Sequence, residues 1–338
     1  MNLIKNKIFK NNVFIIAEIG SNHNQSFKRC IKLINTAKKC GANAVKLQFL
    51  NYERMYFSKE KKSLKNIFKK IELNENWISK LNRYCKKKKI IFFYSSCDTY
   101  GLDICVKNKI SITKIASPQF YSFPELIRHS LNKKLFTFCS TGYSTFSEIK
   151  KIFLKYKLYN NNNIVLMHCL SKYPATVEDI NIHYIKKLKK TFSVNVGYSD
   201  HTMSTVIPAL AVMCGAQCIE KHLTLNRKAK GPDHSFALEP NEFKEMVINI
   251  RTTEKLIKNK NLIEKKDLKT RLQYNLKIFL NKNISCGKKI KKIFIYPLRT
   301  SKKGILYKDF SKIEHFKMLK KNKKKNEILE WKDLEKIS

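Results

Sequence analysis

The chain has 338 residues, 43% of them hydrophobic, and carries 69 Lys and Arg against 26 Asp and Glu, a formal net charge of +43. This hydrophobic content excludes a disordered polybasic tail, and the length predicts about two domains, or one barrel-sized domain with a small appendage. The lysines are spread through every segment, whereas a nucleic-acid module would gather them on one face with interleaved aromatic residues, so we expect no nucleic-acid partner.

Up to about residue 257, short β-branched and aromatic runs alternate with stretches of helical period. The runs predict eight strands, at Val13–Ile19, Ala44–Phe49, Ile90–Ser95, Ile112–Ser117, Leu135–Ser140, Ile164–Leu170, Val194–Ser199 and Cys218–Leu225. Helices are predicted between them, including Phe27–Cys40, Trp77–Lys88, Pro124–Lys133, Phe146–Tyr156, Ile180–Phe192 and Thr205–Cys214. Eight strands that alternate with helices over about 250 residues predict an α/β fold, a (β/α)8 TIM barrel over residues 1–257.

The pattern changes after the barrel. Residues 258–271 begin with a Lys- and Asn-rich stretch that indicates a linker. Residues 272–338 contain short alternating runs at Leu276–Leu280 and Lys292–Tyr296, with a turn at Cys286-Gly287. We therefore predict a small β-rich domain at residues 272–338.

Polar and charged side chains gather at the carboxyl ends of the predicted strands. Glu18, Lys46 and Lys114 each lie in a run that is otherwise apolar. A charged side chain inside a closed barrel is costly unless it has a partner or a ligand, so a buried ion pair remains an alternative explanation for each residue alone. Because the active sites of TIM barrels lie at this end of the strands, the concentration of such residues predicts an active site there.

Two histidines end neighbouring predicted strands, His201 in Gly197-Tyr-Ser-Asp-His-Thr202 and His222 in Glu220-Lys-His222. Neighbouring parallel strands lie about 4.8 Å apart, so both imidazoles can reach one divalent ion. Two imidazoles leave coordination positions for water and a substrate oxygen, which suits a catalytic metal. A single histidine is more often a hydrogen-bonded core residue, and it is the pair that favours a metal site.

A further set of residues is suited to bind anions. It combines two lysines with hydroxyl side chains from different strand ends, namely Lys46, Ser95, Lys114, Ser117, Ser140 and Ser199. Ammonium groups and hydroxyls that converge on one rim form a pocket for phosphate and carboxylate. The loop after the last predicted strand adds Gly231-Pro-Asp233-His234, in which the carboxylate could bind sugar hydroxyls; taken alone, this tetrad could be only a turn.

Nine segments follow one another in order along the predicted barrel: Ile16-Ala-Glu-Ile-Gly-Ser-Asn-His-Asn24, Gly41-Ala-Asn-Ala-Val-Lys-Leu-Gln48, Lys114-Ile-Ala-Ser117, Ser140-Thr-Gly142, His168-Cys-Leu-Ser-Lys-Tyr-Pro174, Gly197-Tyr-Ser-Asp-His-Thr202, Gly215-Ala216, Ile219-Glu-Lys-His222 and Gly231-Pro-Asp-His234. Together they resemble the sialic acid synthase family, which comprises the N-acetylneuraminate synthases and their close relatives. The C-terminal segment, with Asn281-Lys-Asn-Ile-Ser-Cys-Gly287 and Leu298-Arg-Thr300, resembles the antifreeze-like (SAF) domain that follows the barrel in this family.

The resemblance implies an enzyme of the transferase class. Members of the family condense phosphoenolpyruvate with an N-acetylated amino sugar such as N-acetylmannosamine and release phosphate. The resemblance assigns a divalent metal, Mn²⁺ or Mg²⁺, to His201 and His222. It assigns phosphoenolpyruvate to Lys46, Ser95, Lys114, Ser117, Ser140, Ser171 and Ser199, and the sugar to Gln48, Tyr173 and Asp233. Glu18 would orient or deprotonate the reacting water or hydroxyl, and Arg299 would reach the active site of a partner subunit in a domain-swapped homodimer.

Three positions depart from the family pattern and bear on the sugar and the pocket. Leu170 stands where the family usually has Thr, Gln25 replaces a frequent Gly, and Ser95-Ser-Cys-Asp98 differs from the usual Ser-Thr-Pro-Phe-Asp.

The alternative functions are a synthase of a legionaminic-type or other nonulosonic acid or surface-polysaccharide sugar, a catalytically inactive binding barrel, and a nucleic-acid-binding protein. Intact Glu18, His201 and His222 argue against the inactive barrel.

The sequence also bears on the cellular compartment. No apolar run reaches the roughly 18 residues that cross a bilayer, and the N-terminus lacks the small-residue cleavage site of a signal peptide. The ten cysteines occur singly, without a CxxC pair, which favours reduced thiols. We therefore expect a cytoplasmic protein without a membrane partner.

Overall fold

The computed structural model describes residues 8–9, 12–57, 62–258, 265–313, 316–318 and 321–336. The chain divides into two compact units, Met1–Asn259 and Lys260–Ser338. Within the predicted linker at 258–271, residues 259–264 lie outside the described residues. Helix α13 (Lys265–Tyr274) occupies the remainder and continues past it. This helix was not predicted because Lys, Arg and other polar residues dominate its sequence, and Leu268 and Leu272 alone are too few for a recognisable apolar stripe.

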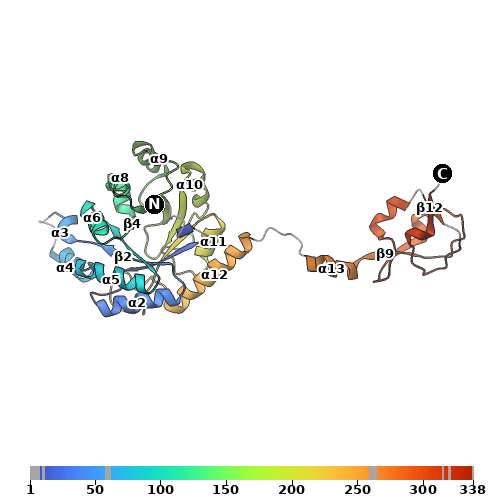
Figure 1. The fold of residues 1–338 in the computed structure, drawn as a ribbon, viewed down its shortest axis with the longest axis horizontal. Coiled ribbons are helices and arrows are strands. Elements are labelled where there is room, and N and C mark those ends of the chain that lie inside the picture. Colours follow the sequence, from blue (N-terminus) through green and yellow to red (C-terminus); the bar gives the residue numbers. More distant parts are fainter. Residues whose placement is uncertain are drawn as a thin grey trace. The chain divides into compact units, whose positions relative to one another are not determined.

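The N-terminal unit is a closed barrel of eight parallel strands, as predicted (Figure 1). The strands pair in chain order: β1 (Phe14–Gly20), β2 (Ala44–Phe49), β3 (Ile91–Ser96), β4 (Ile112–Ile115), β5 (Phe136–Ser140), β6 (Ile164–Cys169), β7 (Asn195–Asp200) and β8 (Cys218–His222). Strand β8 pairs with β1 and closes the barrel. Strand β4 ends before the predicted Ser117, because Ser117-Pro118 begins a short helix with proline near its first position.

Helices surround the barrel (Figure 1). They are α2 (Phe27–Lys39), α5 (Glu75–Lys87), α6 (Thr99–Lys107), α8 (Glu125–Asn132), α9 (Phe146–Lys155), α10 (Tyr184–Phe192), α11 (Ile207–Met213) and α12 (Pro240–Lys258). Three shorter or additional helices lie in the connections, α3 (Tyr52–Met55), α4 (Lys62–Ile71) and α7 (Ser117–Ser122). Helix α12 was not named from the sequence, although it buries Phe243, Met246, Val247 and Ile250 at helical spacing.

Aromatic side chains fill the interior below the polar strand ends. The ring of Phe138 on β5 is fully buried and lies 5.6 Å from that of Phe93 and 6.1 Å from that of Phe14, centroid to centroid. Ser140 lies two residues further along β5 and therefore on the same face of the strand. The packed aromatic layer thus forms the floor beneath the polar residues.

Removing this layer should destabilise the barrel. We expect Phe138→Ala to lower the free energy of unfolding by about 3–5 kcal/mol, because the surrounding rings cannot collapse fully into the space. Urea denaturation measures the change, and Phe57→Ala is the matched control because Phe57 is 70% exposed. Equal stability of the two variants would show that the aromatic layer does not support the fold.

The C-terminal unit is small and β-rich, as predicted. Strand β9 (Leu276–Leu280) pairs antiparallel with β10 (Ile295–Arg299), and β11 (Phe316–Met318) with β12 (Leu334–Lys336). Three 3-10 helices connect them, η1 (Lys292–Phe294), η2 (Tyr307–Ile313) and η3 (Trp331–Asp333). The unit has a hydrophobic cluster of its own, which includes Ile278, Leu280, Ile313 and Leu329.

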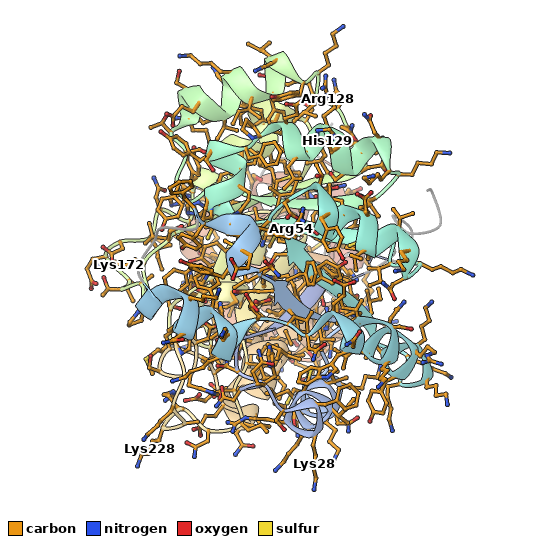
Figure 2. The ribbon with its side chains drawn as sticks, turned by 90° about the vertical axis from the view of Figure 1, so that its left-hand side faces the viewer. Lys28, Arg54, Arg128, His129, Lys172 and Lys228 are labelled. Atoms are coloured by element: carbon orange, nitrogen blue, oxygen red, sulfur yellow. The ribbon has the colours of Figure 1, made fainter. Side chains whose placement is uncertain are left out.

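Basic side chains point away from the barrel unit on separate sides, as Lys28, Arg128 and Lys172 show in Figure 2. Among the helices that the structure describes, none is long and apolar enough to cross a membrane. All ten cysteines are free thiols, and only Cys286 is exposed.

Candidate active site

A cavity of about 320 Å³ lies at the carboxyl ends of the barrel strands. Twelve of the fourteen predicted site residues line it, namely Glu18, Lys46, Gln48, Ser95, Lys114, Ser117, Ser140, Ser171, Tyr173, Ser199, His201 and His222. A larger cavity, of about 600 Å³, lies near the amino ends of the strands and is lined by none of the fourteen. The smaller cavity is therefore the candidate active site.

The charged residues in the cavity form a continuous chain of contacts. Gln48 Nε2 donates to Glu18 Oε1 at 3.0 Å, and Lys46 Nζ lies 2.7 Å from Glu18 Oε2. Lys46 Nζ also lies 3.6 Å from Glu220 Oε1, while Lys114 Nζ donates to Glu220 Oε2 at 2.8 Å. All four charged side chains are buried. The chain of contacts joins strand ends of β1, β2, β4 and β8 across the barrel.

The two carboxyl groups in this cluster have different proton affinities. Burial raises the pKa of the Glu18 carboxyl to about 7, because the charge of Lys46 offsets only part of the cost of removing the carboxylate from water. Burial acts in the same direction on Glu220, but the charges of Lys114 and Lys46 outweigh it and hold the pKa of that carboxyl at about 2. Glu18 is therefore suited to exchange a proton near neutral pH, whereas Glu220 remains a fixed anion.

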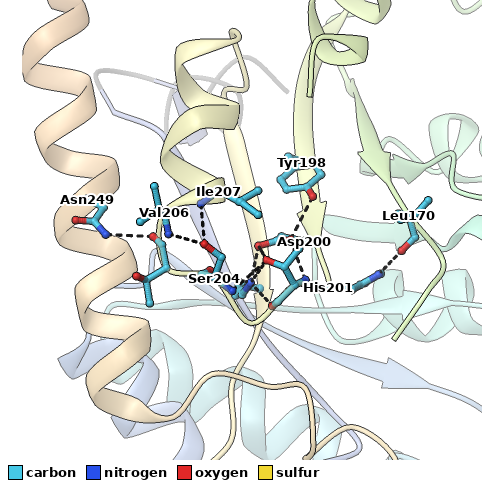
Figure 3. Close-up of polar contacts among 11 residues, drawn as sticks. Leu170, Tyr198, Asp200, His201, Ser204, Val206, Ile207 and Asn249 are labelled. Carbon is cyan, nitrogen blue, oxygen red and sulfur yellow. Dashed lines mark hydrogen bonds and ion pairs between the residues drawn. The ribbon is translucent and has the colours of Figure 1, made fainter. Parts of the chain in front are cut away.

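The two histidines lie together on the cavity wall, with ring centroids 5.6 Å apart. His201 Nδ1 is 2.6 Å from the carbonyl oxygen of Leu170, a contact drawn as a dashed line in Figure 3. Donation of the Nδ1 proton to that carbonyl leaves the lone pair of Nε2 free for a ligand. His222 Nδ1 is buried and has no hydrogen-bond partner among the residues that the structure describes.

Both imidazoles fit the role of metal ligands. Burial lowers the pKa of His222 to about 3 and also lowers that of His201, so both rings are neutral at pH 7, which is the form that binds a metal. Within the described ranges, no group of three or more His, Cys, Asp or Glu side chains is placed to hold a metal ion. A metal bound by the two imidazoles would leave its other coordination positions for further ligands.

An aromatic wall stands beside the histidines. The ring of Tyr173 is tilted by 33° against that of His201, with centroids 4.1 Å apart, and Tyr173 is 52% exposed. The buried ring of Phe236 lies 4.9 Å from His222 and 5.1 Å from Tyr173. Tyr173 was predicted as a site residue, whereas Phe236 was missed because it lies in an irregular loop with no periodic pattern.

The hydroxyl side chains converge where β4, β5 and β6 end. Ser117 Oγ accepts a hydrogen bond from Gly142 N at 3.0 Å. A Cβ atom at Gly142 would lie 2.5 Å from Ser171 Oγ and 3.0 Å from Ser117 Oγ, so only glycine allows both hydroxyls to come this close. Ser140 Oγ is buried and has no hydrogen-bond partner in the part of the chain that the structure describes, and Ser199 Oγ donates to Glu220 at 3.2 Å. Ser140 therefore has an unused donor and acceptor for a ligand.

Two predicted residues do not line the cavity. Asp233 Oδ2 accepts hydrogen bonds from Ser21 N at 2.8 Å and from Ser21 Oγ at 2.9 Å. Gly20 has a φ of +52°, and a Cβ there would lie 2.3 Å from Asp233 Oδ2, so this approach requires glycine. Arg299 lies on β10 of the other unit, with its guanidinium 5.3 Å from the centroid of the Tyr274 ring.

Several lining residues were not assigned a role from the sequence. Glu220 belongs to the motif Glu220-Lys-His222 and, like Lys46 and Lys114, is a charged residue in a predicted strand. The sequence therefore contained enough information to predict it as a site residue. The others come from strand ends and loops and have no comparable signal: Leu50, Met55, Tyr56, Cys97, Ala116, Pro118, Gln119, Tyr143 and Cys169.

Comparison with known proteins agrees with the resemblance seen in the sequence. The sequence model of the NeuB family matches residues 33–262. An uncharacterised protein of Methanocaldococcus jannaschii is 40% identical over 247 residues, which cover 72% of this chain and 72% of that protein. The N,N'-diacetyllegionaminic acid synthase of Legionella pneumophila is 34% identical over 260 residues, 72% of this chain and 73% of that enzyme. The crystal structure of the N-acetylneuraminic acid (sialic acid) synthetase of Leptospira borgpetersenii superposes with a TM-score of 0.70 at 32% identity, covering 78% of this chain and 91% of that one. The chain therefore belongs to the NeuB family.

Proposed function

We propose that this chain is a nonulosonic acid synthase that condenses phosphoenolpyruvate with the open-chain form of an N-acetylated amino sugar and releases phosphate. The observation that carries the proposal is the composition of one cavity, in which two buried lysines and several hydroxyls lie beside two neutral histidines and a carboxyl group with a pKa of about 7. Such a cavity offers an anion site, a metal site and a proton-transfer group together.

The anion site suits phosphoenolpyruvate on grounds of charge. When Glu18 holds a proton, the cluster contains two ammonium groups, Lys46 and Lys114, against the single carboxylate of Glu220. The excess positive charge, together with the free hydroxyl of Ser140, would stabilise a phosphate or carboxylate group in a site with little water. Ser95, Ser117, Ser171 and Ser199 line the same cavity and add further donors.

The histidine side of the cavity would hold a divalent metal ion, Mn²⁺ or Mg²⁺, through His201 and His222. When bound, such an ion supplies a Lewis acid that polarises a carbonyl oxygen. The sugar would lie on this side, between Gln48, Tyr173 and the loop of Asp233, with its aldehyde toward the histidines. The rings of Tyr173 and Phe236 would form one wall of this position.

The reaction balances without a further co-reactant. A bond forms between the methylene carbon of phosphoenolpyruvate and the aldehyde carbon, the aldehyde oxygen takes up a proton, and water adds to the carbon that bears the phosphate. The bond from this carbon to the phosphate oxygen then breaks, which gives a 2-keto acid and free phosphate. Glu18, with its pKa near 7, would give its proton to the aldehyde oxygen and then accept a proton of the adding water, while the remaining hydroxyl proton leaves with the phosphate as the keto group forms. Gln48 would hold the Glu18 carboxyl group in place.

The experiment that tests this function is an assay of phosphate release from phosphoenolpyruvate with a panel of 2-acetamido and 2,4-diacetamido sugars. We expect release only when a sugar of the panel is present, together with a product whose mass equals sugar plus pyruvate. N-acetylmannosamine is the first candidate, and a diacetamido sugar is the second because a legionaminic acid synthase is among the relatives. Failure of every sugar in the panel would overturn the proposal.

Replacing Ser140 tests the binding of phosphoenolpyruvate separately from the stability of the fold. We expect Ser140→Ala to raise KM for phosphoenolpyruvate about 5- to 10-fold, since one neutral hydrogen bond contributes about 1 kcal/mol. Thermal stability should be unchanged or slightly higher, because the variant removes a buried hydroxyl that has no hydrogen-bond partner among the described residues. Kinetics and thermal unfolding of the same preparation check both statements, and an unchanged KM would remove Ser140 from the anion site.

The proposal includes a homodimer in which the C-terminal unit of one subunit covers the cavity of its partner. A two-fold arrangement would let each subunit shield the other's reaction from water, with Arg299 as the group that reaches the sugar. His222→Ala and Arg299→Ala, each inactive alone, should together regain about a quarter of wild-type activity, because half of the dimers are mixed and each mixed dimer has one intact site. Arg128→Ala, an exposed arginine of the barrel unit, is the control that should retain activity. No recovery in a demonstrated mixed dimer would refute the swapped arrangement.

A further inference from the structure

A buried ion pair lies behind the two histidines, and the proposed reaction does not use it. Lys221 Nζ donates to Asp200 Oδ2, and the side chains are 1% and 0% exposed. Asp200 directly precedes His201, and Lys221 directly precedes His222. Because side chains alternate along a strand, the pair lies on the opposite face of the barrel wall from the imidazoles, and neither residue lines the cavity.

The ion pair also fixes the turn that follows β7. Lys221 Nζ donates to the carbonyl oxygens of Thr202 and Ser204, the latter at 3.2 Å. The carboxylate of Asp200 accepts hydrogen bonds from Thr202 N at 3.0 Å, Thr202 Oγ1 at 3.0 Å and Tyr198 Oη at 3.2 Å. Figure 3 shows Asp200 at the centre of these contacts, beside His201. The turn that carries His201 is thereby tied to the residue next to His222.

These side-chain contacts lie where the backbone pairing between β7 and β8 ends. Asp200 and Lys221 are the last residues paired between β7 and β8, so His201 lies just beyond the ladder. His222 pairs with Glu18 on β1, and the carbonyl oxygen of His201 accepts from Ala175 N at 3.1 Å. The two histidines are thus held by different neighbours, and the ion pair with its carbonyl contacts connects their strand ends beyond the last backbone pair.

Stability alone is a weak reason for such a pair, since well-packed hydrophobic residues often replace a buried ion pair without loss of stability. Hydrogen bonds to fixed carbonyls, by contrast, define direction and distance. We propose that Asp200 and Lys221 are positioning residues that set the separation of His201 and His222 so that both imidazoles bind the same divalent ion. This inference rests on the metal site of the proposed function.

The test measures Mn²⁺ affinity in the full-length protein without substrates, from the electron paramagnetic resonance signal of free Mn²⁺. Asp200→Asn, Lys221→Met and the double variant should each bind Mn²⁺ about 10- to 100-fold more weakly than the wild type, the usual loss when a group that orients a ligand is removed. Each single variant leaves a buried charge without its partner and should lower Tm. The double variant removes both charges, so Tm should largely recover while Mn²⁺ affinity stays low.

Glu254→Gln is the matched control, because it breaks a different ion pair of the barrel unit. Glu254 Oε2 lies 3.0 Å from Arg251 Nη1, the Glu254 side chain is 8% exposed, and the pair contacts Val13 just before β1 begins. We expect a lower Tm with unchanged Mn²⁺ affinity. Affinity that follows Tm through all variants, or stays at the wild-type value in the Asp200 and Lys221 variants, would overturn the positioning role alone. A wild type that binds no Mn²⁺, or binds it equally well after His222→Ala, would overturn the metal site and the inference with it.

Discussion

His222→Ala should lower kcat/KM for phosphate release by at least about 10³-fold, since a Lewis acid contributes several kcal/mol of transition-state stabilisation and each 1.36 kcal/mol is tenfold in rate. The variant removes one of the two neutral imidazoles that line the cavity and could bind a metal through a ring nitrogen. With only His201 left, we expect the bound ion to be lost as well, so added Mn²⁺ should not restore turnover. Treating the wild type with a chelator should give the same loss, and Mn²⁺ should reverse it.

The control for this experiment is His129→Ala. His129 lies on α8 outside the cavity, and its partly exposed side chain has Nε2 4.0 Å from Glu125 Oε1 (labelled in Figure 2). It should keep full activity and the same response to chelation as the wild type. If the chelated wild type were fully active, the metal assignment of both cavity histidines would be wrong, even if His222→Ala were inactive.

The barrel and most of the cavity were predictable because their signals are local. Lys46 and Lys114 stood out as charges in apolar strand runs, and the two-residue period of a strand shows which side chains share a face. In a barrel, the position of a residue at a strand's carboxyl end is enough to bring it near the other strand ends. Ten of the twelve lining residues could therefore be assigned to one cavity from their positions at strand ends, whereas Ser171 and Tyr173 were assigned by the family resemblance.

Partners within the cavity were not predictable, because they depend on contacts between distant parts of the chain. Glu220 and Lys114 are 106 residues apart, and Ser21 and Asp233 are 212 apart. Nothing in either local pattern specifies that Glu220 would have two lysine neighbours while Glu18 would have one. The pKa difference between these two carboxyls follows from that count, so their division into a proton-transfer group and a fixed anion required the structure.

The second large effect on activity is expected from replacing the two cavity lysines. Lys46→Met and Lys114→Met should each lower kcat/KM for phosphoenolpyruvate by about 10²- to 10³-fold, the usual loss on removal of a preorganised charged donor from a site with little water. KM for the sugar should change little, because the sugar is proposed to lie on the histidine side of the cavity. Lys133→Met is the control, since Lys133 is partly exposed and pairs with Asp103 on the surface.

The two lysine variants should differ in stability, which shows whether the cluster has the charges we assign to it. Lys46→Met leaves Glu18 beside Gln48, and a carboxyl with a pKa already near 7 can take up a proton and become neutral. Lys114→Met leaves the Glu220 carboxylate with Lys46 at 3.6 Å as its remaining cation, and breaking a buried pair in this way costs about 3–5 kcal/mol. We therefore expect the larger loss of unfolding free energy at pH 7 for Lys114→Met, measured by urea denaturation. If that variant is too unstable to assay, Lys46→Met still tests the anion site through its kinetics. Unchanged kinetics in both variants would mean that the lysines only neutralise Glu18 and Glu220, and that the phosphate of the substrate binds elsewhere.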